Sequence, residues 1–270
     1  MAAPTPTEVS LPGPAAFVAC GQHTCAAVLR DGKGLYTWGK GAHGVLGHGD
    51  EKNCEEPKMV DVGGKNVTGV SLGHLCSCCW TDEGDLFVWG STEHGVKKSK
   101  PNATPTLVPG DWWGEGVGVV DASTSRGLHY SCILVACSDG SMWAWGSNYK
   151  GMLGLCKVGE EARWTHGDDD TLWHLLPTKA DQRAFGDPSD PPSHVVKVCC
   201  GGIHCSAMNK KGEIFTWGCG SDGRMGLEGA EDHRYLFRTV LPTKVVDIPR
   251  KTSKAVFLAA AYYVTGAVYV

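Results

Sequence analysis

Residues 19–24, which read Ala-Cys-Gly-Gln-His-Thr, lead through an apolar run to Trp38-Gly39 and then to Gly44-Val45-Leu46-Gly47. The dipeptide Trp-Gly then returns three times with a histidine and a turn pair before it, at intervals of about fifty to seventy residues, close to the length of one propeller blade. The four copies are Trp38-Gly39, Trp89-Gly90, Trp145-Gly146 and Trp217-Gly218. Self-similarity at this period predicts one structural unit repeated along the chain.

A histidine and a turn signal precede each Trp-Gly. The histidines are His23, His74, His129 and His204, with Gly21 two positions before the first. The turn signals are Asp31-Gly32, Glu83-Gly84, Asp139-Gly140 and Lys211-Gly212. A pair of the Asp-Gly type between two apolar runs is typical of a β-hairpin. Each unit therefore supplies at least three short strands. A further strand is expected to begin at a proline such as Pro57 or Pro105, where a missing N–H does little harm.

A fifth unit begins at the end of the chain. Val256–Ala267 aligns with Val196–Ala207, but no Trp-Gly follows before Val270. We therefore predict an all-β propeller with four recognisable blades and the start of a fifth. The expected organisation is a flexible tail at 1–16 and a partial propeller at 17–270. Its units lie at about 17–66, 67–119, 120–194 with an insertion at 156–194, 195–254 and 255–270.

The composition and the terminal segments indicate which partners and which cellular location to expect. A net charge of −4 over 270 residues argues against a general nucleic-acid binder. Residues 1–16 have no apolar core of a secretory signal, so the 13 cysteines are expected to be reduced and intracellular. Ala255–Val270 is too short for a membrane span, which needs about twenty apolar residues. A cytoplasmic location is favoured, and the short basic run Lys97-Lys98-Ser99-Lys100 leaves a nuclear one open.

These units resemble the repeat of the regulator of chromosome condensation family, from about Phe17 to Ala267. That repeat runs as an apolar strand, Cys-Gly-x-x-His-Ser/Thr, a second strand, Asp-Gly, an aromatic strand ending in Trp-Gly, and Gly-x-Leu-Gly. The resemblance implies a ring of seven blades, which needs on the order of 350–400 residues. We therefore expect either that this sequence is truncated or that a second chain closes the ring.

The repeated residues are expected to be structural. The four histidines would fill one slot per blade and bond to nearby backbone, although a ring of metal ligands or bases is the functional alternative. Cys25, Cys76, Cys132 and Cys205 follow these histidines, in a slot that suits a small apolar side chain. Zinc ligation by Cys76-Ser77-Cys78-Cys79, or by Cys199-Cys200 with His204-Cys205, is the alternative. The favoured interpretation has no catalytic residue, cofactor or metal.

Two segments outside the repeat pattern are candidates for partner binding. One is Trp112-Trp113, because exposed tryptophan is enriched at interfaces, although packing under its loop is an equal alternative. The other is the insertion, with Trp164, Asp168, Asp169, Asp170 and Trp173, which could equally be a solvated loop. Within it, Thr171–Leu176 is predicted to be a short helix, with Asp170 as N-cap and Pro177 ending it.

The favoured function is a non-enzymatic, intracellular platform for protein partners, because the repeated residues serve the blades and leave the loops for recognition. The resemblance adds an alternative, guanine-nucleotide exchange on a small GTPase of the Ran type. The plant UV-B photoreceptors share this repeat, but their Gly-Trp-Arg-His motifs have no tryptophan counterpart at Gly21-Gln22-His23 or Gly73-His74. That function is therefore not expected here.

Overall fold

A computed structural model describes residues 5, 7–91, 102–128, 130–156, 173–227, 238–245 and 255–269. In these residues four sheets of four antiparallel strands follow one another along the chain, and a two-stranded sheet comes last. We call these sheets blades 1 to 5. The strands are β1 Ala15–Cys20, β2 Thr24–Leu29, β3 Leu35–Gly39 and β4 Cys54–Val60 in blade 1; β5 Val67–Leu72, β6 Cys76–Thr81, β7 Leu86–Gly90 and β8 Asn102–Val108 in blade 2; β9 Val119–Thr124, β10 Cys132–Cys137, β11 Met142–Ser147 and β12 Trp173–Lys179 in blade 3; β13 Val195–Cys200, β14 His204–Asn209, β15 Ile214–Cys219 and β16 Arg238–Lys244 in blade 4; β17 Ala255–Ala260 and β18 Thr265–Tyr269 in blade 5.

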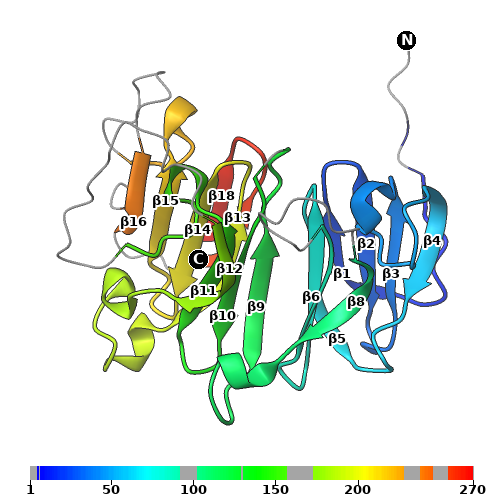
Figure 1. The fold of residues 1–270 in the computed structure, drawn as a ribbon, viewed down its shortest axis with the longest axis horizontal. Helices are drawn as coiled ribbons and strands as arrows, with labels where there is room; N and C mark the ends of the chain where they lie inside the picture. Colours follow the sequence, from blue (N-terminus) through cyan, green and yellow to red (C-terminus); the bar gives the residue numbers. More distant parts are fainter. Residues whose placement is uncertain are drawn as a thin grey trace.

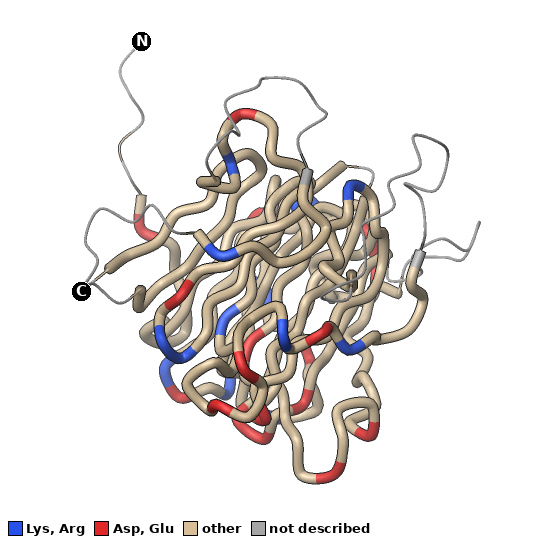
Figure 2. The backbone as a smooth tube through the Cα atoms, turned by 90° about the vertical axis from the view of Figure 1, so that its left-hand side faces the viewer, with Lys and Arg blue, Asp and Glu red and all other residues tan. Residues whose placement is uncertain are grey.

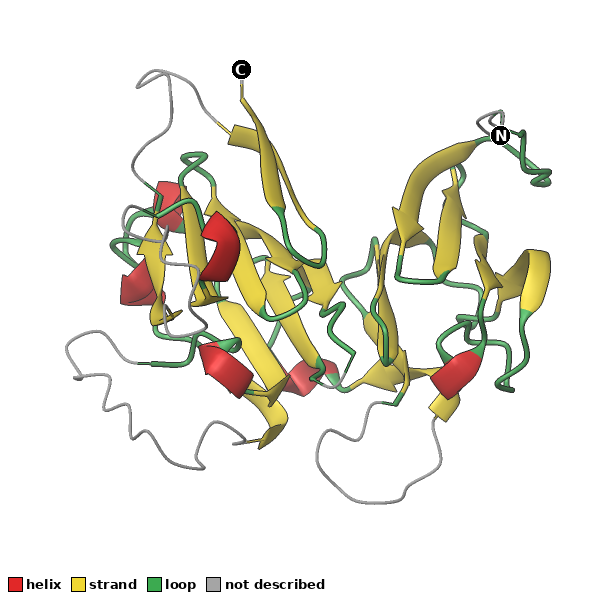
Figure 3. Cartoon of the chain, turned by 90° about the horizontal axis from the view of Figure 1, so that it is seen from above, coloured by secondary structure: helices red, strands yellow, loops and turns green. Residues whose placement is uncertain are grey.

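The blades stand side by side in an arc, as the predicted propeller requires (Figures 1 and 3). The first strand of each blade packs against the first strand of the next, from β1 through β5, β9 and β13 to β17. In Figure 3 blade 1 and blade 5 form the two ends of this arc. The prediction of four blades and the beginning of a fifth is therefore confirmed.

Antiparallel order sends alternate connections to opposite faces of the arc. We call these the lower and upper faces, as drawn in Figure 1. The hairpin turns between second and third strands and the connections between blades lie on the lower face. The loops after first and third strands lie on the upper face. Short 3₁₀ turns lie within the connections: η1 Ala42–Gly44, η2 Gly110–Trp112, η3 Tyr149–Gly151, η5 Gln182–Phe185, η6 Pro191–Ser193 and η7 Ser221–Gly223.

Tryptophan locks neighbouring blades together. The Nε1 of Trp89 in blade 2 donates to the carbonyl of Val45 in the Gly-Val-Leu-Gly loop of blade 1, at 2.7 Å. Trp217 in blade 4 donates in the same way to the carbonyl of Met152 in blade 3, at 2.8 Å. Both tryptophans are fully buried. The repeated Trp-Gly and Leu-Gly segments therefore join blade 2 to blade 1 and blade 4 to blade 3.

The junction between blades 2 and 3 is built differently. Blade 2 lacks the Leu-Gly loop in its sequence, and residues 92–101, which follow its Trp-Gly, lie outside the described residues. The ring of Trp145 instead lies 6.3 Å from that of Trp113, between centroids. Trp113 also meets Trp143 edge-on, at 5.5 Å. A tryptophan from the β8–β9 connection thus occupies this junction.

Two local predictions are wrong. The fourth strands do not begin at proline, because Pro57 lies inside β4 and Pro105 inside β8. These are outer strands whose pairing is broken by a register shift, as between Thr37 and Gly39, so the ring nitrogen costs no ladder bond. The predicted helix at Thr171–Leu176 is replaced by strand β12, which pairs with β11 from Trp173 onward. Pairing with an existing sheet overrides the local capping pattern.

Candidate functional site

Trp112 and Trp113 lie at the end of the 3₁₀ turn η2 on the lower face. Trp113 is only 4% exposed and belongs to the core between blades 2 and 3, so its side chain supports the loop from beneath. Trp112 is half-buried, and its loop carries exposed Asp111 and Glu115. Of the two tryptophans, only Trp112 presents surface to a partner.

Trp112 packs against a core cluster that also contacts Trp143, and hydrogen bonds hold Trp143 in place. The indole Nε1 of Trp143 donates to the hydroxyl of Ser141 at 3.0 Å, and that hydroxyl donates to Asp139 at 2.6 Å. Lys179 lies 5.7 Å from the ring of Trp143 and 3.5 Å from the carboxylate of Asp139. Figure 2 marks several acidic positions along the backbone toward the lower end of the molecule. The patch is a half-buried indole with an acidic surround.

Only one residue of the second predicted patch is described. Trp164, Asp168, Asp169 and Asp170 lie outside the described residues, as does the basic run at 97–100. Trp173 begins β12 and pairs with Ser147, at the upper end of β11. The connection of Trp112 follows β8 at its lower end. Trp173 and Trp112 therefore lie toward opposite faces of the arc.

The prediction that the histidines fill one slot per blade is wrong. Strand register places His204 opposite Gly218, whereas Thr24, Cys76 and Cys132 lie opposite the matching glycines of blades 1 to 3. His23 and His74 lie instead in the loops before their strands, and His129 lies outside the described residues. His204 lies 13 residues before its tryptophan, whereas His23 and His74 lie 15 before theirs, and this offset separates a strand position from a loop position.

His204 is a bridge between blades. Its Nε2 lies 2.9 Å from the hydroxyl of Thr265 in blade 5, so its partner is a side chain and not the expected backbone. Burial, with the positive charge of Arg224 nearby, lowers the pKa of His204 to about 4. A neutral imidazole buried at a junction serves packing, as the structural interpretation of this histidine requires.

A small hollow on the upper face brings together three loop histidines, of which His43 is not part of the repeated histidine pattern. It has a volume of about 160 Å³ and is lined in part by His23, Lys40, His43 and His74. The rings of His43 and His74 lie 5.8 Å apart. His43 has a φ of +63°, and Lys150 and Asp222 take the same left-handed conformation at matching loop positions. One backbone shape thus presents a different polar side chain on each of three blades.

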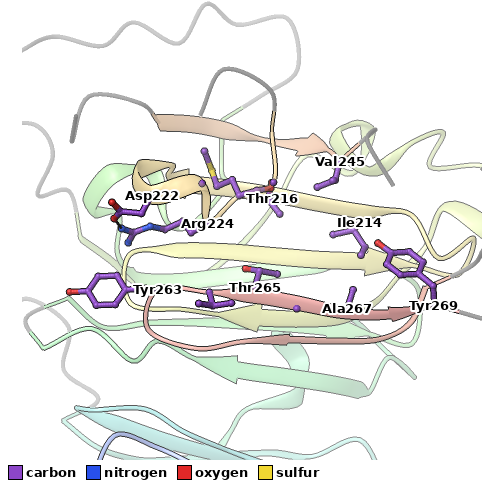
Figure 4. A pocket seen from close by; sticks show the side chains of 14 residues that line it. Ile214, Thr216, Asp222, Arg224, Val245, Tyr263, Thr265, Ala267 and Tyr269 are labelled. Carbon is purple, nitrogen blue, oxygen red and sulfur yellow. Dashed lines mark hydrogen bonds and ion pairs between the residues drawn. The ribbon is translucent and has the colours of Figure 1, made fainter. Parts of the chain in front are cut away.

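A larger pocket of about 350 Å³ lies between blade 4 and the hairpin of blade 5 (Figure 4). Arg224 occupies the loop position that Val45 and Met152 hold in blades 1 and 3. Its guanidinium contacts Asp222 at 2.6 Å and lies 5.1 Å from the ring of Tyr263. At the junctions of blade 1 with blade 2 and of blade 3 with blade 4, this region takes the tryptophan of the following third strand. In the described residues, blade 5 has only two strands.

The inner strands surround a central hollow of about 200 Å³. Here the carboxylate of Asp121 in β9 accepts from Lys197 at 3.0 Å and from the backbone N–H of Val198 at 2.8 Å. Burial raises the pKa of Asp121 to about 6, and Lys197 opposes that rise. Arg126 donates to the carbonyls of Cys200 and Ala260, at 2.8 and 2.7 Å. These contacts tie blades 3, 4 and 5 together at the axis.

Three cysteines from two blades meet in the core. The Sγ atoms of Cys132, Cys200 and Cys205 lie within 4.8 Å of one another, and all three residues are fully buried. The expected single cysteine slot is in fact two positions, because Cys76 and Cys132 begin their strands whereas Cys25 and Cys205 lie opposite tryptophan. The sequence shows the three cysteines but does not indicate that Cys132 of blade 3 lies against Cys200 and Cys205 of blade 4.

A model of the Regulator of chromosome condensation (RCC1) repeat matches residues 33–80, 139–208 and 211–268, more than half of the chain. The chain belongs to the RCC1 repeat family. The resemblance inferred from the Trp-Gly units is thereby confirmed. No described helix is both long and apolar enough to cross a membrane.

Relatives in this family differ widely in size. The chain is 32% identical to human E3 ubiquitin-protein ligase HERC2 over 225 residues, which are 79% of this chain and 4% of that protein. It is 28% identical to the human RCC1-like G exchanging factor-like protein over 248 residues, 91% of this chain and 49% of that protein. The chain thus spans half or less of the length of these RCC1 relatives.

Solved structures share the fold. The crystal structure of human WBSCR16 has a TM-score of 0.76 at 24% identity, over 97% of this chain and 60% of that one. Prp20p from Saccharomyces cerevisiae has a TM-score of 0.69 at 19% identity, over 97% and 57%. The RCC1-type propeller is therefore the fold of this chain.

Proposed function

We propose that this RCC1-repeat chain is a non-enzymatic platform for protein partners. The observation that carries the proposal is the patch around Trp112, a half-buried indole held on a packed tryptophan base and outside the blade-to-blade locks. An aromatic anchor on a rigid base loses little conformational entropy when it is covered. Its acidic surround, with Asp111 and Glu115, favours a partner segment that pairs an apolar side chain with basic ones.

The cysteines bear on the cellular compartment of the proposed platform. None of the thirteen is joined to another in a disulfide bond. Free cysteines in this number suit a reducing, intracellular compartment. We therefore propose protein partners inside the cell, in the cytoplasm or the nucleus, without direct nucleic-acid or membrane binding.

The test compares proteins captured by wild-type and variant chains. Trp112→Ala removes the anchor, and the double variant Asp111→Lys, Glu115→Lys reverses the surrounding charge. Met59→Ala is the matched control, because Met59 is an exposed apolar residue on the outer strand β4. We expect partners captured by wild type and Met59→Ala to be lost from both patch variants, as read by quantitative mass spectrometry. Identical partner sets for all four chains would refute the proposal.

The second candidate is guanine-nucleotide exchange on a Ran-type small GTPase. It is favoured by the likeness to the human RCC1-like G exchanging factor-like protein, which covers 91% of this chain. The measurement is release of labelled GDP from a panel of small GTPases at micromolar protein. Acceleration would support exchange, and unchanged release rates would exclude it for those GTPases.

A further inference from the structure

Each blade junction brings together three side-chain positions that the strand register defines. The first position begins the second strand of a blade, as His204 does in blade 4. The other two are a cross-strand pair in the next blade, such as Ala260 and Thr265. The bond between His204 and Thr265 shows that the positions meet across the junction. The corresponding sets at earlier junctions are Thr24 with Leu72 and Ser77, Cys76 with Thr124 and Ile133, and Cys132 with Cys200 and Cys205.

Among these sets in the described chain, the junction of blades 3 and 4 alone consists of thiols. Cys200 and Cys205 face each other across β13 and β14, and Cys132 approaches them from β10. Burial alone would be satisfied by alanine, threonine or serine, which other blades place in these positions. Three sulfurs at one point supply a chemistry that those side chains lack.

The cluster is enclosed by the protein. All three residues are fully buried, and their sulfurs lie within 4.8 Å of one another. Arg126 donates to the carbonyl of Cys200 beside them and helps to fix the end of β13. Converging sulfur atoms are the ligand type that soft cations prefer.

We propose that Cys132, Cys200 and Cys205 form a three-sulfur binding site for Cu(I). Thiolate ligands select soft cations, and Cu(I) accepts three of them without water. Structural zinc takes four protein ligands, and this group of the described residues offers three. Metal–sulfur bonds of about 2.3 Å in a plane put the sulfurs about 4 Å apart, which the observed separation allows. Cu(I) binding would release the protons of the thiols that become thiolate ligands to solvent.

Blade 1 supplies a natural comparison. Cys20 and Cys25 hold the same two cross-strand positions as Cys200 and Cys205, and their Sγ atoms lie 3.9 Å apart. No third cysteine faces this pair within the described residues. Two thiols in the same register should therefore bind Cu(I) far more weakly than three.

The test titrates the reduced chain, without oxygen, with Cu(I) held by a coloured chelator. We expect one tightly bound Cu(I) per chain and three sulfur ligands at about 2.3 Å by X-ray absorption. Cys132→Thr, Cys200→Ala and Cys205→Ser each insert the residue that a sister blade carries at that position, so folding should persist. Each should weaken binding by about a hundredfold or more.

The matched controls are Cys20→Ala and Cys25→Ser, which make the same kinds of change in blade 1. They should leave Cu(I) affinity unchanged, and circular dichroism of every apo variant checks the fold. Equal weakening by control and cluster variants would overturn the proposal. So would tighter binding of Zn²⁺ than of Cu(I), or a site with fewer than three sulfurs.

Discussion

Gly47 shows how one residue determines whether two blades can meet. It closes the Leu-Gly loop of blade 1 with a φ of +80°. A Cβ built there would lie 3.1 Å from the Nε1 of Trp89 and from Val60. The left-handed conformation and the approach of the indole thus both favour glycine. Single residues of the repeat act in this molecule chiefly at the junctions between blades.

Gly47→Ala should destabilise the chain by about 2–3 kcal/mol, because it combines backbone strain with a clash at Trp89. Gly63→Ala is the control, since Gly63 has a similar φ of +68° and nothing within 4 Å of a built Cβ. It should cost only about 1 kcal/mol. Urea unfolding followed by tryptophan fluorescence measures both, and equal costs would show that the clash is absent.

Trp217→Phe should destabilise by about 1–3 kcal/mol, because the buried carbonyl of Met152 loses its donor. Trp38→Phe is the matched change in blade 1, where the tryptophan is only half-buried. It should have little effect on the thermal midpoint. If both variants lost equal stability, the hydrogen bond from Trp217 to the carbonyl of Met152 would not be the cause.

The buried His204 predicts a pH dependence of stability. Its folded pKa of about 4 lies below the ordinary value of 6.5, so the folded state resists protonation. The stabilisation is therefore present above pH 6.5 and is lost as the pH falls toward 4, by at most about 3 kcal/mol. The raised pKa of Asp121, about 6, acts in the opposite sense, because its contribution grows as the pH falls from 6 to 3.8.

His204→Thr, which inserts the residue of blade 1, separates the two groups. Between pH 7 and 4.5 the variant should lose less stability on acidification than the wild-type chain. The free energy of unfolding in urea, measured across this range, gives both slopes. Parallel curves would mean that His204 titrates normally in the folded chain.

Two elements differ from what their local sequence predicts: the connection between β8 and β9, and strand β12. Blade 2 lacks the Leu-Gly loop, and the connection after β8 supplies Trp113 to the junction with blade 3. Strand β12 forms where a capping pattern predicted a helix, because β11 offers it a partner edge. An element in this chain is thus determined as much by the neighbouring strand as by its own residues.

Trp113→Ala should cost about 3–5 kcal/mol, because it opens a cavity beneath Trp143 and Trp145. Trp112→Ala, one residue away and half-buried, should cost clearly less, on the order of 1 kcal/mol. Thermal unfolding of the two variants tests this contrast. If the Trp113→Ala chain were as stable as the wild-type chain, Trp113 would not be the packed support of Trp112 that the proposed binding patch requires.

The whole molecule is an arc whose last described sheet has two strands. β18 pairs with β17 on one side and has no strand on the other within the described residues. A free strand edge with exposed apolar residues such as Val268, which is 54% exposed, can pair with another chain.

The isolated 270-residue chain should associate as its concentration rises, because the edge of β18 is open to pairing. Val268→Lys should shift that association to higher concentration, since a charge on an edge strand opposes pairing. Val18→Lys on β1 is the control at another exposed apolar site. Light scattering after size exclusion measures the mass, and a monomer at every concentration would contradict the prediction.

The sequence by itself determined the repeat and the number of blades, because glycine, turn pairs and Trp-Gly recur in order. It also identified Trp112-Trp113 as a candidate patch. Only the tertiary structure decided that Trp89 and Trp217 join neighbouring blades, that Trp113 is core, that the histidines differ in position, and that Cys132 meets Cys200 and Cys205. The physical reason is that strand register and contacts between blades bring together residues that are far apart in the sequence, which a repeat pattern does not encode.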